Sequence, residues 1–314
     1  STLYMIASFF KTSKPIHYII FSIVLTSLFV YNIIIGRNFV SNVFNSFNEL
    51  SYFLVLIASL LTLVFIVTKN NLTHNNSFAA LFFCLFIMAF PQTLQDPSKL
   101  IANLCVLLSL RRIVSLNNKT NIAKKLLDAS LWVCLAILFD FFSIFFFMPL
   151  IMGLILYSAF EIKNIFIVFC SILAFGVLLS SFNLLVYNHL PVFSDYFTFS
   201  NVKIQKNIFQ NDIMFSAFML LTIFFGVINY FFTGAFKNRA NRPSTLILIF
   251  IIIAGIVAFL FCQIDSKEIC LYVLAPTAIL MANYCETTRY RWVPELIIIS
   301  LVIAPILQLS FNLL

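Results

Sequence analysis

Long uninterrupted apolar runs are the feature that most limits what this chain can fold into. Residues 245–261, TLILIFIIIAGIVAFLF, contain no charged side chain, and similar runs recur along the 314 residues. A helix of about 20 apolar residues crosses a hydrocarbon core ~30 Å thick. Only 10% of the residues are charged, whereas a soluble domain carries about 25%. The runs also lack the alternation of membrane β-barrel strands. The sequence therefore predicts an all-α, polytopic transmembrane helix bundle.

Apolar segments of this kind predict about eleven spans. They cover residues 17–36, 52–68, 77–92, 97–113, 126–141, 144–160, 164–185, 213–235, 244–263, 269–285 and 293–312. Residues 1–15 precede the first span and combine apolar residues with two lysines, which is typical of a segment lying on the membrane surface. Asp96 before Pro97 predicts a helix cap and start. No Gly-, Ser- or Pro-rich linker divides the chain, so 1–314 is expected to form a single membrane domain.

The distribution of Lys and Arg predicts how these spans are oriented. With the spans above, fourteen of the nineteen basic residues fall in the segments on one side of the membrane. Because Lys and Arg accumulate on the cytoplasmic side, the N-terminus is predicted to be cytoplasmic and the C-terminus outside. The net charge of +8 is therefore interpreted as orientation information, and no nucleic-acid partner is expected.

An acid in the segment LFDFFSIFFF, residues 138–147, needs an explanation. As one helix, residues 126–160 would be about 52 Å long, too long for one crossing, and basic segments flank them. We therefore expect a helical hairpin with Asp140 near its outer turn. Three roles stay open for this region. Asp140 or Ser143 caps the next helix, Asp140 is a functional acid facing a cavity, or Asp140 belongs to a buried ion pair.

The longest outer loop is predicted at residues 187–212, and it contains Asp195, Asp212, a histidine and two lysines. On a lipid-linked substrate, an Asp would act as a base and a Lys would approach the diphosphate. The candidate catalytic residues are therefore Asp140, Asp195 and Asp212. The alternative is that this loop is a solvated connection.

Two basic segments are candidates for binding lipid phosphate. Arg111 and Arg112 belong to SLRRIVSLNNKTNIAKK, and Arg289 and Arg291 belong to ETTRYRWVPE. Clustered cations at the inner face attract anionic lipid headgroups. The alternative is ordinary anchoring of the spans, with aromatic residues and Arg at the headgroup level. The bilayer and anionic lipids are the expected partners, with other membrane subunits as further candidates.

The chain lacks the Walker A, GxGxxG, HExxH and GxSxG motifs. Its seven cysteines form no CxxC pair, and its three histidines are far apart. No cofactor or metal is therefore expected.

Three segments, DPSKLIANLCVLLSLRRIVSL, AKKLLDASLWVCLAILFDFFSIFFFMPLIMGLILY and FEIKNIFIVFCSILAFGVLLS, resemble an uncharacterised family of polytopic inner-membrane proteins of Bacteroidota. This resemblance implies a multi-pass protein of the bacterial inner membrane and no particular activity. By span number, the chain more loosely resembles lipid-carrier-dependent glycosyltransferases of the C superfamily and O-antigen polymerases.

These observations leave three functional hypotheses, and they leave open whether the protein is an enzyme. The first is a membrane subunit or assembly factor of a cell-envelope machine, with secretion or gliding as candidates. The second is a handler of polyprenyl-linked glycans with an outward-facing site. The third is a solute transporter.

Overall fold

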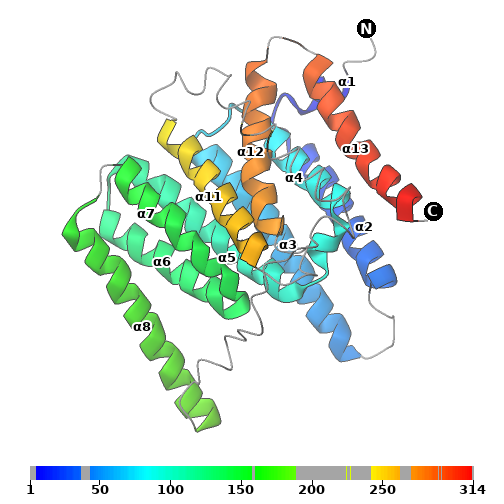
Figure 1. Cartoon of the computed structure of the whole chain (residues 1–314). Coiled ribbons are helices and arrows are strands. Elements are labelled where there is room, and N and C mark those ends of the chain that lie inside the picture. The colour runs from blue at the N-terminus through cyan, green and yellow to red at the C-terminus, as the bar shows by residue number, and fades with distance from the viewer. Residues whose placement is uncertain are drawn as a thin grey trace.

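A computed structural model describes most of the chain, and every regular element in its described part is a helix (Figure 1). The described residues are 5–36, 43–157, 160–188, 224, 227, 242–261, 270–288, 290 and 292–312. The helices are α1 (Met5–Phe10), α2 (Pro15–Gly36), α3 (Val43–Lys69), α4 (Phe78–Ala89), η2 (Pro91–Leu94), α5 (Pro97–Val114), η3 (Ser115–Asn118), α6 (Ile122–Phe139), η4 (Phe141–Phe146), α7 (Phe147–Leu156), α8 (Ile162–Tyr187), α11 (Arg242–Phe261), α12 (Leu271–Thr287) and α13 (Trp292–Asn312).

Helix length and composition identify a membrane protein. Four of the described helices, α3, α5, α8 and α11, are long and apolar enough to cross a membrane. Shorter apolar helices accompany them, namely parts of α2 and α13, the whole of α4, and η4 with α7. The predicted all-α class is confirmed in this form.

Most of the predicted spans coincide with a described helix, although several boundaries were wrong. The predicted span 213–235 lies outside the described residues apart from 224 and 227. Helix α3 begins at Val43 rather than at residue 52, so Glu49 belongs to a helix instead of the predicted loop. Helix α4 ends early because Phe90 leaves the helical conformation (φ −125°, ψ 62°) just before Pro91.

Two of the apolar helices are too short to cross a membrane alone. Helix α4 has 12 residues and α7 has 10, which correspond to about 18 Å and 15 Å of helix. The predicted span 144–160 was wrong in its first part, where the chain forms the 3₁₀ helix η4 before α7 begins. A long apolar run thus gives the location of a span but not its helical length.

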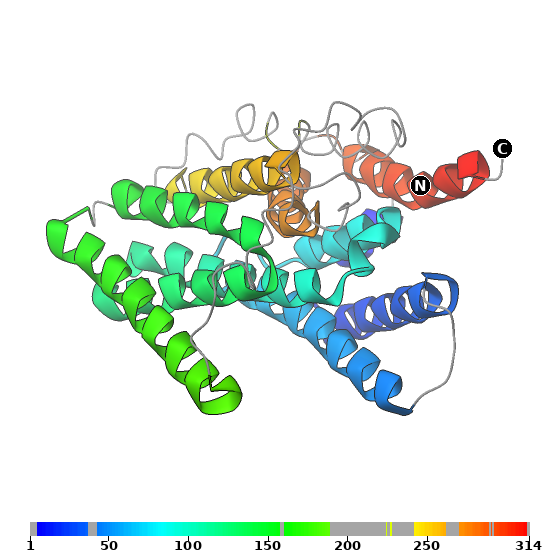
Figure 2. The same cartoon turned by 60° about the horizontal axis from the view of Figure 1, so that its bottom comes forward.

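Helices α4 and α12 form the centre of the bundle. Met88 is the one residue of α4 that is not buried, and the apolar residues of α12 are buried along most of its length. Helix α4 packs against α2, α3, α12 and α13, whereas α5 pairs with α6, and α11 packs on α12 and α7. Helix α8 lies on the outside of the bundle beside α6, as both views show (Figures 1 and 2).

Contacts between helix ends show which termini share one end of the bundle. A Cβ built on Gly153 of α7 would lie 2.7 Å from Ile113 of α5 and 3.9 Å from Ile247 of α11. The hydroxyl of Tyr157 also lies 3.1 Å from that of Ser244, at the start of α11. The last turn of α5, with its two arginines, and the first turn of α11 therefore lie at the same end. Arg111, Arg112 and Arg242 are among the fourteen basic residues that the sequence predicted on one side of the membrane.

Glycine allows the closest approach between α11 and α12. A Cβ built on Gly255 would lie 2.6 Å from Cγ2 of Val273, far inside van der Waals contact. The methyl groups of a β-branched residue cannot easily move aside, because Val has one strongly preferred rotamer in a helix. By contrast, a Cβ built on Gly176 of α8 would meet nothing within 4 Å. Small residues at such crossings let helices in membranes approach closely.

We expect Gly255→Leu to lower the thermal stability of the purified protein in detergent, because the new side chain overlaps Val273. Overpacking typically costs about 1–3 kcal/mol. Gly176→Leu is the matched control and should leave the melting temperature unchanged or higher. Melting can be followed by size-exclusion chromatography after heating. Equal losses in the two variants would show that the α11–α12 contact is not tight.

Candidate functional site

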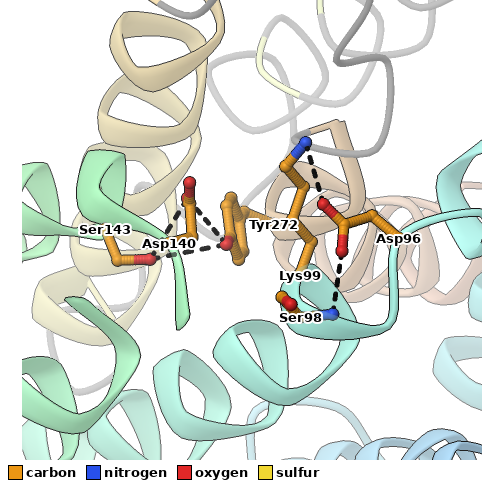
Figure 3. A network of polar contacts seen from close by, with 6 residues as sticks. All are labelled: Asp96, Ser98, Lys99, Asp140, Ser143 and Tyr272. Atoms are coloured by element: carbon orange, nitrogen blue, oxygen red, sulfur yellow. Dashed lines mark hydrogen bonds and ion pairs between the residues drawn. The ribbon is translucent and has the colours of Figure 1, made fainter. Parts of the chain in front are cut away.

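A buried polar cluster surrounds Asp140 at the turn between α6 and η4 (Figure 3). The backbone of Asp140 is extended (φ −147°, ψ 111°), which ends α6. Its side chain is 8% exposed. The hydroxyl of Tyr272, at the start of α12, donates to Oδ2 of Asp140 over 2.9 Å. The hydroxyl of Ser143 lies 3.5 Å from the same oxygen and 3.4 Å from the hydroxyl of Tyr272.

The structure confirms the predicted helical hairpin and changes the interpretation of its acid. Asp140 lies in the turn, as expected, but its side chain makes no capping hydrogen bond to η4. The carboxylate instead accepts from Tyr272, which comes from a helix more than a hundred residues further along the chain. Sequence reasoning missed Tyr272 because it lies within an apolar run. A tyrosine there is nevertheless a signal, since a buried tyrosine hydroxyl usually finds a partner.

A second acid lies beside this cluster at the start of α5. Oδ1 of Asp96 accepts from the backbone N–H of Ser98 over 2.9 Å, which confirms the predicted cap. Oδ2 of Asp96 lies 3.4 Å from Nζ of Lys99, whose side chain is only 12% exposed. Figure 3 shows Tyr272 between Asp140 on one side and the Asp96–Lys99 pair on the other. The Tyr272 hydrogen bond therefore joins the end of α6 to the start of α12, and the Asp96–Lys99 pair of α5 lies beside it.

The chemistry of this cluster follows from how its groups are paired. The Lys99 ammonium pairs with Asp96, and each of the two carboxylates accepts a hydrogen bond from another residue. Buried polar groups that satisfy one another rigidify a core. As arranged, the hydrogen bond between Asp140 and Tyr272 holds the turn after α6 against the start of α12. A carboxylate and an ammonium at one end of a bundle are also the groups that could meet a phosphorylated substrate.

The other residues predicted for catalysis, Asp195 and Asp212, lie outside the described residues. Arg289 and Arg291, predicted to bind lipid phosphate, also lie outside them. Asp140 is thus the one predicted catalytic residue whose surroundings the structure describes.

Arg111 and Arg112 lie in the last turn of α5, at the end of the bundle away from Asp140. Nη2 of Arg112 lies 2.8 Å from Oδ2 of Asp128. The ammonium of Lys125 donates to the backbone carbonyl of Ser115 over 2.6 Å, where cations are favoured by the helix dipole. The guanidinium of Arg111 lies over an aromatic ring of α3 rather than beside an acid. The two neighbouring arginines therefore have different environments.

The N-terminal segment is tied to the same end by groups that sequence reasoning did not single out. Nδ1 of His17 lies 2.7 Å from Oγ of Ser77, and both side chains are buried. The backbone N–H of Ser77 donates to the carbonyl of Phe10 over 3.1 Å. The N–H of Ala7 donates to Glu295 Oε1 of α13 over 2.9 Å. These contacts fix the segment against the starts of α4 and α13.

Glu286, near the end of α12, receives a hydrogen bond from the backbone of the neighbouring loop. The N–H of His74 donates to Oε1 of Glu286 over 2.8 Å. Burial raises the pKa of the Glu286 carboxyl from 4.5 to about 7, although the His74 N–H opposes this shift. Glu286 belongs to the connection predicted between the last two spans, outside the hydrocarbon core.

One comparison with known proteins found a relationship. The model of a family described as a family of unknown function, DUF6427, matches residues 15–313. No curated protein and no solved structure matches the chain.

We expect the thermal stability of the protein to depend on pH through Glu286, and we expect Glu286→Gln to make this dependence smaller. The folded state binds the Glu286 proton more tightly than the unfolded state, so this group's stabilising contribution is fully present below pH 4.5. It is lost as the pH rises to about 7. The wild-type melting temperature should therefore fall more between pH 5 and 7.5 than that of the variant, whose amide oxygen can still accept from His74. Parallel melting curves for the two proteins would contradict the assignment.

Proposed function

This chain belongs to the DUF6427 family of unknown function, and we propose that it is a membrane subunit or assembly factor of a bacterial cell-envelope machine. The observation that carries this proposal is the hydrogen bond between Tyr272 and Asp140. It joins two helices through a carboxylate that is 8% exposed. A group held in this way stabilises the bundle and is poorly placed to exchange protons with a substrate.

The proposal includes a topology. The chain crosses the bacterial inner membrane about eleven times, with the N-terminus in the cytoplasm and the C-terminus outside. Its support is the gathering of arginines at one end of the bundle. Arg111, Arg112 and Arg242 share one end, whereas Asp96 and Asp140 lie at the other. Because basic residues collect at the cytoplasmic face, we expect the end that holds Asp96 and Asp140 to lie outside.

This topology has a direct test. A single cysteine at Asn117, in η3 at the basic end, should react with a membrane-impermeant maleimide only after the cells are opened. A cysteine at Gln95, beside Asp96, should react in intact cells from which the outer membrane has been stripped. Both measurements need a background without the native cysteines, of which the described ones are mostly buried. The reverse labelling pattern would invert the orientation.

A second candidate is the handling of lipid-linked glycans. The observation that favours it is the position of Lys99, whose ammonium pairs with Asp96 beside Tyr272 and Asp140 at the proposed outer end (Figure 3). Helix α8 also ends at Tyr187, where the loop predicted to contain Asp195 and Asp212 begins. A carboxylate and an ammonium could act on a diphosphate leaving group. The transporter hypothesis stays a prediction from the sequence.

The two candidate functions predict different defects in the variants Asp140→Asn and Tyr272→Phe. For a structural subunit, Tyr272→Phe removes the 2.9 Å donor of a buried carboxylate and costs about 1–3 kcal/mol. Both variants should then have lower melting temperatures, lower abundance in cells and less co-purifying partner. Tyr290→Phe, whose side chain is 65% exposed, is the matched control.

Raising the expression of the two variants to wild-type abundance separates the candidates. A structural role predicts that partner recovery in mild detergent and surface glycan both return to normal. A catalytic role predicts that Asp140→Asn still lacks surface glycan at full abundance, while its partners and stability are normal. The second result would replace the subunit proposal with the glycan proposal.

A further inference from the structure

Two cations share one aromatic ring at the basic end of the bundle. The guanidinium carbon of Arg111 lies 4.2 Å from the centre of the Phe65 ring, and Nζ of Lys69 lies 5.1 Å from it. Neither cation forms an ion pair with an acid in the described part of the chain, in contrast to Arg112 with Asp128. Contact with an exposed ring contributes only about 0.5–1 kcal/mol. Two neighbouring cations are thus brought together without an anion to balance them.

Further positive charge lies beside this pair. Burial and the nearby charges of Arg112 and Lys69 lower the pKa of Lys125. Its ammonium already donates to the Ser115 carbonyl, and Asp128 is paired with Arg112. The cations available to an incoming anion are therefore Lys69 and Arg111. They come from the last turns of α3 and α5.

An exposed apolar stripe leads away from these cations along α3. Leu50, Leu54, Leu61 and Phe65 are all at least 36% exposed. Their spacing of four and seven residues places them on one face of the helix. The stripe runs from Phe65, beside the cations, toward the other end of α3.

The neighbouring helix continues this surface. Ile101, Leu104 and Leu108 of α5 are partly exposed, and their spacing leads along one face to Arg111. Helices α3 and α5 pack against each other. The end that holds the two cations is thus continuous with two rows of apolar side chains.

We propose that Lys69 and Arg111 bind the phosphate of an anionic phospholipid, with an acyl chain lying along the α3 stripe. The guanidinium lies over the Phe65 ring and makes no ion pair with a described acid, and its fork of N–H groups matches phosphate oxygens. The apolar rows favour a lipid over a free phosphate ion, which would contact only the end of the site. This site does not depend on the subunit proposal, because it lies at the opposite end from Asp140.

The test is retention of lipid by the purified full chain. The protein is equilibrated in mixed micelles containing equal amounts of phosphatidylglycerol and phosphatidylcholine, and bound lipid is counted by native mass spectrometry. We expect phosphatidylglycerol to be retained selectively. The double variant Lys69→Gln with Arg111→Gln should lower this retention by about tenfold or more, since each cation near a lipid surface contributes measurably. Leu61→Gln should also lower retention, although every charge remains.

Lys119→Gln with Lys124→Gln is the matched control, because it removes the same charge from exposed residues at the same end. Its retention should equal that of the wild type. If the first double variant does not fold, Arg111→Lys combined with Phe65→Leu keeps both charges and removes the stacked geometry, and it should lower retention as well. The proposal is overturned if the control loses as much lipid, if the two lipids bind equally, or if inorganic phosphate displaces the lipid.

Discussion

The cost of placing an unpaired polar group in hydrocarbon is the constraint on which this structure depends. Each such group costs several kcal/mol, so the backbone is satisfied within helices and the charged side chains lie at helix ends. Asp96 caps α5 at one end, while Arg111, Arg112 and Lys125 lie at the other. The bundle therefore has two chemically different ends joined by an apolar middle.

Asp140 shows how the structure accommodates a buried acid under this constraint. The break between α6 and η4 frees backbone groups, and the carboxylate there receives the Tyr272 hydroxyl instead of capping the new helix. One hydrogen bond thereby joins the hairpin of α6 and α7 to α12. The tight contact at Gly255 holds α12 against α11 as well. The polar and the apolar contacts thus fix the same central helix from two sides.

The sequence was sufficient for the class of fold and for the approximate positions of most described helices, because long apolar runs and paired basic turns carry that information. The cap at Asp96 was also predictable, since Asp before Pro is a local signal. The end of α4 had a signal that the apolar run concealed, because Pro91 disfavours a helical Phe90. The start of α7 was not predictable, because no polar residue marks where η4 becomes α7.

Partners distant in sequence were the larger gap at the candidate site. Tyr272 and Asp140 are 132 residues apart, and His17 and Ser77 are 60 apart. Neither pair has a spacing that a single sequence reveals. The pairing of Lys69 and Arg111 on Phe65 was hidden for the same reason, because it depends on how α3 packs against α5. Arg111 itself was predicted from charge alone, since clustering of cations is visible locally.

The hydrogen bond from Ala7 to Glu295 has a consequence for biosynthesis, because its two residues are 288 positions apart. At about 5–20 residues per second, the ribosome adds Glu295 roughly 15–60 s after Ala7. During that interval the amide of Ala7 has no carboxylate to bind, and the helices between them enter the bilayer first. The contact between α1 and α13 thus forms only after α13 has been made, and a nascent chain that stops before α13 holds its N-terminal segment through the contacts with Ser77.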